Sequence, residues 1–295
     1  MVKSLSILIP VRNHNCCRLL AALTSQCNRQ ADLEWEIIVL DDASTDAASI
    51  AENRVATQRP GVTLLENAQN EGRSRARNRL AQSAHNEWLL FLDSDVQIID
   101  PLFVVKYLRC DQTEVTCGGC IVPNISNSHQ QNLRYLYEAK CQSRLYATHR
   151  KRNPYKSFRT INYLIRRTTM LDNLFPEDHH SYGYEDVLLG RRLCRKNVSI
   201  CHIDNYVMIG DFEPNDAFLE KTREALRTLH AYEPFLIKYN GVASLISRLR
   251  RIHLAGLLSF AFRLLRPALE RNLLGTHPRV FLYNVYRTGY YSTLS

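Results

Sequence analysis

The sequence predicts an α/β fold: a mostly parallel β-sheet with helices on both faces, followed by a C-terminal helical extension. Strand-like and helix-like segments alternate through the first third of the chain. The strand-like segments are apolar at consecutive positions, which is typical of strands buried on both faces. After Pro214 only helical spacing of apolar residues is found. With 295 residues, 45% of them hydrophobic, the chain can bury the core of one large domain with an appendage.

The elements of the predicted sheet follow one another in a regular order. Strands are expected at Leu5–Pro10, Trp35–Leu40, Val62–Glu66 and Glu87–Leu92, and helices between them at Cys16–Cys27, Asp46–Gln58 and Gly72–Ala84. Sheets of this class bind ligands in the crevice at the carboxyl ends of their strands. Functional residues are therefore expected directly after each strand.

The remaining two thirds of the chain are less regular. Strands are expected at Val115–Pro123 and Thr160–Arg167, and helices at Gln130–Thr148, Glu185–Asn197, Glu213–Pro234 and Gly241–Leu274, the last as one or two helices. A boundary is predicted near Asp211–Pro214. It separates a domain of residues 1–212 from a basic helical region of residues 213–295.

Two aspartates follow the fourth predicted strand, in the stretch LLFLDSDV. Residues two apart in a strand point to the same side, so Asp93 and Asp95 can face one site while Ser94 faces away. Two carboxylates that close repel each other unless a cation lies beside them. Mg²⁺ and Mn²⁺ suit carboxylate oxygens. The alternative is an Asp-rich turn without a ligand, and the pattern by itself leaves both open.

Other polar residues follow the first two strands and open the third helix. Asp41 can hydrogen-bond a base or sugar, whereas Asp46 is expected only to cap the next helix. Arginines stand at positions 73, 75 and 77, where a helix N-terminus favours anions. Arginines at every second position cannot all share one helical face, so at most one or two can serve a ligand. The alternative is a solvated basic face.

A second acidic pair, Glu185 and Asp186, follows Gly183 at an expected helix start. One of the two acids can cap the helix or interact with its dipole. The other can take a proton from an acceptor hydroxyl group, as a general base does.

The cysteines and the apolar segments indicate the cellular compartment in which the protein is expected. The nine cysteines include one lone C-x-x-C, Cys117 to Cys120, with no second ligand pair at zinc-binding spacing. Reduced thiols in the core are therefore expected rather than zinc or disulfides. The first residues do not read as a secretory signal, and the longest apolar stretch, Leu254–Leu265, is too short to span a bilayer. A cytoplasmic protein is expected.

Taken in order, seven stretches resemble family 2 glycosyltransferases of the GT-A fold, of the type that builds bacterial surface polysaccharides. They read LSILIPVRN, EIIVLDDASTD, NEGRSRARN, WLLFLDSDV, GG, NYLIRRTTM and YGYED. The resemblance implies a nucleotide-sugar donor, expected to be a UDP-sugar, and a divalent cation, Mn²⁺ or Mg²⁺. It also implies a nucleotide-binding half over residues 1–100 or so and an acceptor half over the rest of the domain.

The resemblance also implies roles for individual residues. Asp95 is the expected direct metal ligand, and Asp93 is expected to contact the ribose and the metal. Asp186 would be the base that deprotonates the acceptor, and Glu185 would orient that acceptor. The implied reaction is direct displacement at the anomeric carbon with inversion. The residues implied to contact the nucleotide-sugar are Pro10, Arg12, Asn13, Asp41, Arg73, Arg77, Asp93 and Ser94.

The chain departs from the family pattern in two places. Many relatives carry a histidine after the Glu-Asp helix that completes the metal site, but the stretch 205–211 reads NYVMIGD. His202 and Asp211 are the alternatives nearby, and His202 is expected to be a buried histidine in a strand. Arg12 stands where an aromatic residue is frequent, and an arginine can still stack on a base.

The net charge of +9 is concentrated near the C-terminus, where residues 236–295 contain nine Lys and Arg but only Glu270 as an acid. Residues 241–295 can form interfacial helices on an anionic membrane, which would make the protein peripheral on the inner face of the cell membrane. The aromatic stretch 281–291 fits such an interface. The alternative is a helical appendage with a solvated basic face. A nucleic-acid partner is not expected.

Three other functions compete with that of a glycosyltransferase. A sugar nucleotidyltransferase would need a glycine-rich loop after the first strand, where PVRNHNCC has no glycine. A non-catalytic nucleotide-sugar or membrane-surface binding module is the alternative from another class. A nucleic-acid binder rests only on the charge of the tail.

Overall fold

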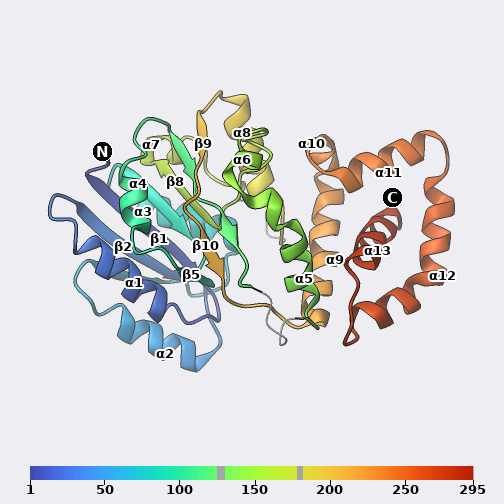
Figure 1. Ribbon diagram of the computed structural model, residues 1–295, viewed down its shortest axis with the longest axis horizontal. Coiled ribbons are helices and arrows are strands. Elements are labelled where there is room, and N and C mark those ends of the chain that lie inside the picture. The colour runs from blue at the N-terminus through green and yellow to red at the C-terminus, as the bar shows by residue number, and fades with distance from the viewer. Residues whose placement is uncertain (125–129, 178–181, 295) are drawn as a thin grey trace. The chain divides into compact units, whose positions relative to one another are not determined.

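The computed structural model describes residues 1–124, 130–177 and 182–294, and these divide into two compact units (Figure 1). The sheet unit comprises Met1–Pro123, Ser143–His180 and Leu189–Asp211. The helical unit comprises Asn124–Gln142, Ser181–Leu188 and Phe212–Ser295. The predicted α/β fold with a mostly parallel sheet and a helical C-terminal part is confirmed.

The central sheet of the sheet unit has seven strands in the order β3-β2-β1-β4-β8-β6-β9. Strands β1, β2, β3 and β4 run parallel, and β8 is antiparallel to both of its neighbours, β4 and β6. The strands are β1 (Ser4–Val11), β2 (Glu34–Asp41), β3 (Val62–Glu66), β4 (Trp88–Leu92), β6 (Val115–Cys117), β8 (Asn162–Arg166) and β9 (Ile200–His202). The chain order reverses between β1 and β4, which is where such sheets bind ligands.

Helices cover both faces of this sheet because the crossovers between parallel strands are right-handed. The chain moves outward from β1 to β3 and then returns to β4, so α3 must lie on the opposite face from α1 and α2. Helices α1 and α2 lie side by side (Figure 1), whereas α3 contacts β1, β2 and α7. The helices are α1 (Cys17–Cys27), α2 (Ala47–Ala56), α3 (Arg73–Ser83), α4 (Phe103–Leu108), α6 (Ala147–Arg150), α7 (Arg167–Leu171) and α8 (Glu185–Arg195).

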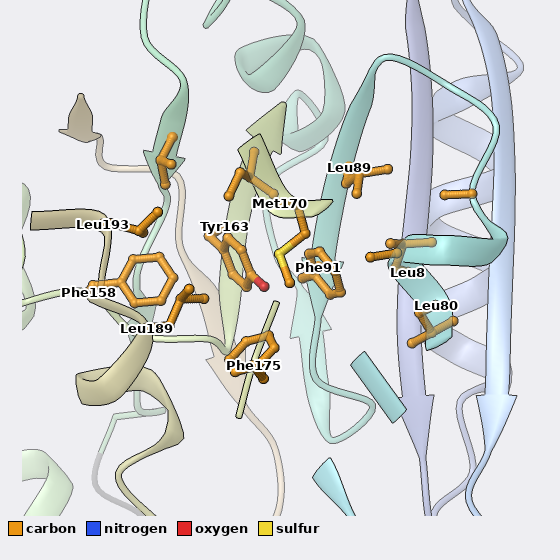
Figure 2. Close-up of a cluster of buried hydrophobic side chains, with 14 of the residues drawn as sticks. Leu8, Leu80, Leu89, Phe91, Phe158, Tyr163, Met170, Phe175, Leu189 and Leu193 are labelled. Carbon is orange, nitrogen blue, oxygen red and sulfur yellow. The ribbon is translucent and has the colours of Figure 1, made fainter. Parts of the chain in front are cut away.

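The core on the α3 face explains why these strands are apolar at consecutive positions. Phe91 of β4 and Tyr163 of β8 are directly opposite each other, and their rings stack at 4.9 Å (Figure 2). Leu80 of α3, Met170 of α7 and Leu189 of α8 pack into the same cluster. Leu90 and Leu92 of β4, which alternate with Leu89 and Phe91, are also fully buried.

The predicted single strand at Val115–Pro123 is wrong. The chain forms β6, breaks at Gly118 and Gly119, and resumes as β7 (Cys120–Ile121) in a second sheet. That sheet has the order β5-β10-β7, with β5 at Val96–Ile98 and β10 at Val207–Ile209. The turn requires glycine at both positions, since a Cβ on Gly118 would lie 2.3 Å from the Tyr107 hydroxyl group and Gly119 has a φ of +83°.

The helical unit contains α5 (Leu133–Cys141) and the helices that follow Phe212. These are α9 (Asn215–Ala231), α10 (Glu233–Leu236), α11 (Gly241–Arg251), α12 (Ala255–Leu273) and α13 (Val280–Ser292). The predicted helix at Gln130–Thr148 is wrong in extent, because it breaks into α5, a short 3-10 turn at Gln142–Leu145 and α6. No helix within the described ranges is both long enough and apolar enough to cross a bilayer.

The aromatic stretch 281–291 does not form an interface as a whole. Tyr283, Tyr286 and Tyr291 of α13 are buried in the clusters of the helical unit. These positions recur at helical spacing, so the same face of α13 that carries the tyrosines packs inward. Among the aromatic residues of this stretch, Phe281, at the start of the helix, is the exposed one, at 69%.

Candidate functional site

The ends of β1 and β2 are joined by hydrogen bonds that place the first group of predicted residues. The two strands pair up to Val11 opposite Asp41, and the Asp42 amide donates to the Val11 carbonyl at 2.9 Å. Asn13 follows in the left-handed region, with a φ of 51°, a conformation that asparagine tolerates better than most residues. Pro10 is half-buried and Arg12 is exposed at this edge.

Asn13 fixes the turn after β2 with its side chain. Its Oδ1 atom accepts from the amides of Thr45 at 2.7 Å and Asp46 at 3.1 Å, and its own amide donates to Ser44 Oγ at 2.8 Å. The side-chain oxygen of Asn13 is thus already engaged by the protein. Asp46 caps α2 by accepting from the Ser49 amide at 3.2 Å, as the sequence predicted.

The two aspartates of the Asp41-Asp42 pair have different environments. Asp41 Oδ1 accepts from the Ser44 amide at 2.7 Å. Asp42, which was not singled out from the sequence, accepts from the amides of Glu71 at 2.8 Å and Gly72 at 2.9 Å and from Asn67 Nδ2 at 2.7 Å. Asp42 therefore ties the end of β2 to the start of α3. Both carboxylates are buried.

Arg77 and Asp93 form a buried ion pair under the end of β4. Arg77 Nη2 donates to Asp93 Oδ1 at 2.5 Å, and the arginine side chain is 2% exposed against 23% for the aspartate. The guanidinium group also lies 5.9 Å from the centre of the Phe175 ring. Arg77 holds the first carboxylate of the Asp-Ser-Asp stretch in place. Arg73, one turn earlier on α3, is exposed, and of the two predicted arginines it is the one accessible to a ligand.

Asp95 lies at the junction of β4 and β5, beside the end of β10. Ile209 of β10 is opposite Val96 of β5, and the Gly210 amide donates to the Asp95 carbonyl at 3.2 Å. The backbone of Asp211 therefore directly follows the contact with Asp95. Asp211 Oδ2 lies 2.7 Å from Nε2 of His14. Three segments that are far apart in the sequence meet here, and His14 is a residue that sequence reasoning missed.

His202 does not face this site. It is fully buried on β9, its Nδ1 lies 2.8 Å from Nη1 of Arg150, and its Nε2 lies 2.9 Å from the Pro154 carbonyl. Because the guanidinium group can only donate, Nε2 must carry the proton. Burial, together with the neighbouring Arg150 cation, lowers the pKa of His202 to about 4. The expected reading of His202 as a buried strand histidine agrees with these contacts, and neither ring nitrogen can take a metal.

The carboxylates at the strand ends suit a hard divalent cation, although they are not a complete cage. Among residues 1–124, 130–177 and 182–294, no three His, Cys, Asp or Glu side chains are grouped as a metal site. Mg²⁺ typically uses one or two carboxylates together with substrate phosphates rather than an all-protein cage. Asp93 and Asp95 lie between β4 and β5, and Asp211 follows β10 beside the backbone of Asp95.

The Gly118-Gly119 turn is fixed by a network of buried polar side chains. Asn162 Nδ2 donates to the carbonyls of Gly119 and Asn205, each at 2.8 Å, and the Tyr107 hydroxyl group donates to Asn162 Oδ1 at 2.6 Å. Arg150 donates to the Gly118 carbonyl at 3.0 Å. Cys117 and Cys120, beside the glycines, are buried thiols outside any disulfide, and burial raises the pKa of Cys117 to about 12.

The second acidic pair opens α8. Gly183 and Tyr184 have φ values of 96° and 67°, and this left-handed turn leads directly into the helix. Glu185 is buried, Asp186 is half-buried, and Asp186 Oδ1 accepts from the Val187 amide at 2.7 Å. Both acids belong to the helical unit. The preceding residues 178–181 lie outside the described residues.

Comparisons with known proteins agree with this arrangement. The sequence model of glycosyl transferase family 2 matches residues 6–175, more than half of the chain. The uncharacterized glycosyltransferase YfnE of Bacillus subtilis is 25% identical, with an alignment that covers 81% of this chain and 71% of YfnE. Two uncharacterized glycosyltransferases of Haemophilus influenzae are 31% and 33% identical over 31% of this chain, and the matches span only 29% and 36% of their own lengths.

A solved structure has a similar fold over nearly the whole chain. It is the mannosyltransferase PcManGT from Pyrobaculum calidifontis in complex with GDP-Man and Mn²⁺. It is 14% identical with a TM-score of 0.55, and the match covers 98% of this chain and 84% of PcManGT. At this identity the likeness concerns the fold alone, and it confirms the GT-A architecture.

Proposed function

Because the chain belongs to glycosyl transferase family 2, we propose that it moves a sugar from a nucleotide-sugar, with a UDP-sugar as the expected donor, to a hydroxyl group of a glycan or lipid-linked acceptor. The observation that carries this proposal is the pair of strand-end carboxylates. Asp93 is held by the buried Arg77, and Asp95 follows it at the junction with β5. An ion pair that fixes one carboxylate supports a binding role rather than a solvated turn.

The nucleotide is proposed to bind at the edge formed by the ends of β1, β2 and β4. Arg12 is exposed there and Asp41 is held by the turn of β2. Arg73 is exposed at the N-terminus of α3, where backbone amides and a positive side chain favour a phosphate. Pro10, Asn13 and Ser94 complete the proposed contacts, with Asn13 acting mainly through the turn that it fixes.

A divalent cation, Mn²⁺ or Mg²⁺, is proposed to be held by Asp95, with Asp93 and Asp211 as the neighbouring carboxylates. When bound, such a cation neutralises charge on a diphosphate leaving group. Asp211 is favoured over His202 as the additional ligand. Its side chain is 70% exposed and paired with His14 next to Asp95, whereas both ring nitrogens of His202 are engaged. The Mn²⁺ in the PcManGT complex is consistent with a cation in this fold.

Asp186 is proposed as the base of an inverting transfer, and Glu185 as the residue that orients the acceptor. The Asp186 carboxylate takes the proton of the acceptor hydroxyl group as its oxygen bonds to the anomeric carbon. The bond from that carbon to the diphosphate oxygen breaks, and the nucleoside diphosphate leaves with the electron pair. An α-linked donor would thus give a β-linked product.

The base assignment is tested with Asp186→Asn. This variant keeps the size of the side chain and removes its basicity, so nucleotide affinity should stay within about twofold, while transfer should fall by about 10²-fold or more. Calorimetry with UDP, with and without Mn²⁺, measures binding. Product formation with a panel of UDP- and GDP-sugars measures transfer. Transfer at a near-normal rate in Asp186→Asn would show that another group is the base.

The same measurements separate an enzyme from a non-catalytic binding module. A module would bind UDP in the presence of Mn²⁺ but would neither transfer nor slowly hydrolyse any donor of the panel. The matched control is Asp46→Asn, which alters a carboxylate that only caps α2. That variant should bind UDP and transfer like the unmodified chain.

A further inference from the structure

Helix α12 is apolar on two opposite sides, but the residues that the structure describes cover only one of them. Its inner side contributes Phe262, Leu269 and Leu273 to a buried cluster with Tyr283 and Tyr286 of α13. A helix that is apolar all round is normally buried on every side. The second apolar side of α12 is therefore expected to contact another molecule.

The outer side carries three large apolar residues at helical spacing. Leu257, Phe260 and Leu264 are 65%, 63% and 68% exposed, and intervals of three and four residues place them in one row along α12. We call this row the α12 stripe. Ile252 and Leu254, just before α12, are also exposed, at 59% and 45%. A contiguous exposed apolar surface of this kind marks an interaction site, whereas single exposed apolar residues do not.

Exposed arginines surround the α12 stripe. Arg263 lies beside Leu264, and Arg271 continues the stripe two turns further on. Arg248 and Arg251 lie in the last turn of α11, next to Ile252. All four are exposed. The only acid of residues 236–295, Glu270, is already paired with Arg223 and Arg266.

A cavity of about 400 Å³ opens next to the stripe, within the helical unit. Arg250, Arg263, Ser259 and Phe260 line it. It therefore combines the exposed guanidinium group of Arg263 and a hydroxyl group with one residue of the apolar stripe, while Arg250 is paired with Glu233. Guanidinium groups recognise phosphate oxygens through paired hydrogen bonds. An apolar row with a cationic cavity beside it matches a lipid, whose phosphate group and acyl chains are joined in one molecule.

We propose that α11 and α12 form a docking surface for an anionic membrane, with the α12 stripe inserted among the lipids and the exposed arginines at the headgroup level. This arrangement is the one that interfacial helices adopt, with apolar residues on one side and Arg or Lys around them. Each Arg or Lys near an anionic leaflet adds to the electrostatic attraction. A second copy of the chain fits less well, because it would bring a segment with the same excess of arginine against this one.

Vesicle flotation of the full chain tests the proposal without any sugar donor. The chain should float with vesicles of equimolar phosphatidylcholine and phosphatidylglycerol but not with vesicles of phosphatidylcholine alone. Because the attraction is partly electrostatic, raising the salt from about 0.1 M to about 1 M should weaken the binding. A triple variant with Leu257→Gln, Phe260→Gln and Leu264→Gln should lose at least about tenfold in affinity. The matched control, Val55→Gln, changes a residue of α2 that is 67% exposed and should bind normally.

A second readout guards against a general effect of the triple variant on folding. The stripe is on the surface, so the thermal unfolding midpoint should change little. In Phe260→Trp, the indole emission should shift to shorter wavelength on addition of anionic vesicles and be quenched by brominated acyl chains. Equal flotation with neutral vesicles, unchanged flotation of the triple variant, or no flotation of the unmodified chain would overturn the proposal. A dimer in sedimentation that the triple variant abolishes would instead assign the surface to a second copy and overturn it equally.

Discussion

Replacing Arg77 by methionine should destabilise the protein by about 3 kcal/mol, because it breaks a buried ion pair rather than a surface one. At a separation of 2.5 Å and an effective dielectric constant of about 20, two unit charges attract each other by about 7 kcal/mol. Much of this offsets the desolvation of the guanidinium group. Breaking a buried pair by removing one partner typically costs about 3–5 kcal/mol. Asp93 retains 23% exposure, so water can partly solvate the abandoned carboxylate, which places the expected value at the low end.

Urea unfolding of four proteins measures this effect as a double-mutant cycle. Arg77→Met, Asp93→Asn and the double variant are compared with the unmodified chain. If the two side chains interact as the structure indicates, the two single variants together should lose more free energy of unfolding than the double variant does. The difference between that sum and the loss in the double variant should be about 2 kcal/mol or more. The control is Arg73→Met, which changes an exposed arginine on the same helix and should cost less than about 1 kcal/mol.

The same variants separate positioning from nucleotide binding. Arg73→Met should weaken UDP binding in calorimetry while leaving the free energy of unfolding almost unchanged. Arg77→Met should lower both the affinity for UDP and the free energy of unfolding, because Asp93, which Arg77 holds in place, is part of the proposed site. Additivity of Arg77→Met and Asp93→Asn within about 0.5 kcal/mol would refute the reasoning, because it would mean that the ion pair contributes nothing to the folded state.

Three further outcomes are expected. Asp211→Asn should weaken Mn²⁺ binding about tenfold or more in calorimetry with UDP present, whereas His202→Gln should leave Mn²⁺ binding unchanged. The reverse pattern would show that His202, and not Asp211, is the additional metal ligand. Gly118→Ala should lower the free energy of unfolding by about 2 kcal/mol, because its Cβ would lie 2.3 Å from the Tyr107 hydroxyl group and the neighbours are close-packed; a neutral effect in urea unfolding would contradict that crowding. Above about pH 6.5, His202 should not affect the pH dependence of the free energy of unfolding. Between about pH 6.5 and about pH 4 that free energy should fall by up to about 1.4 kcal/mol per pH unit as the pH is lowered, because the pKa of His202 is about 4 in the folded state and about 6.5 when unfolded. Equal pH slopes for His202→Gln and the unmodified chain would disprove this.

The first half of the sheet could be predicted because its signals are local. A strand that is covered on both faces must be apolar at nearly every position, and the runs at β1, β2 and β4 meet that requirement without reference to the rest of the chain. The helices between them have helical spacing of their own, and Asp46 caps α2. None of these steps depends on which residues touch across long sequence distances.

The predictions failed where distant residues decide the local structure. The apolar run from Val115 to Pro123 has the composition of one strand. Its break at Gly118 is set by Tyr107, Asn162 and Asn205, which come from other parts of the chain. Short elements such as β5, β10 and α4 carry too few residues for a periodic signal. They form because neighbouring elements pair with them or pack on them.

The same distinction applies within the candidate site. The sequence could single out Asp93 and Asp95 because a pair of acids at the end of an apolar strand is unusual. It could not separate Arg73 from Arg77, which both lie near the start of α3. The difference arises from Asp93, sixteen residues beyond Arg77. A carboxylate partner makes the burial of Arg77 tolerable, whereas Arg73 is exposed. A site of this kind is therefore two sets of residues, one that contacts ligands and one that holds the first set in place. Asp42, Asn13 and Arg77 belong to the second set, and only their hydrogen bonds and ion pairs reveal it.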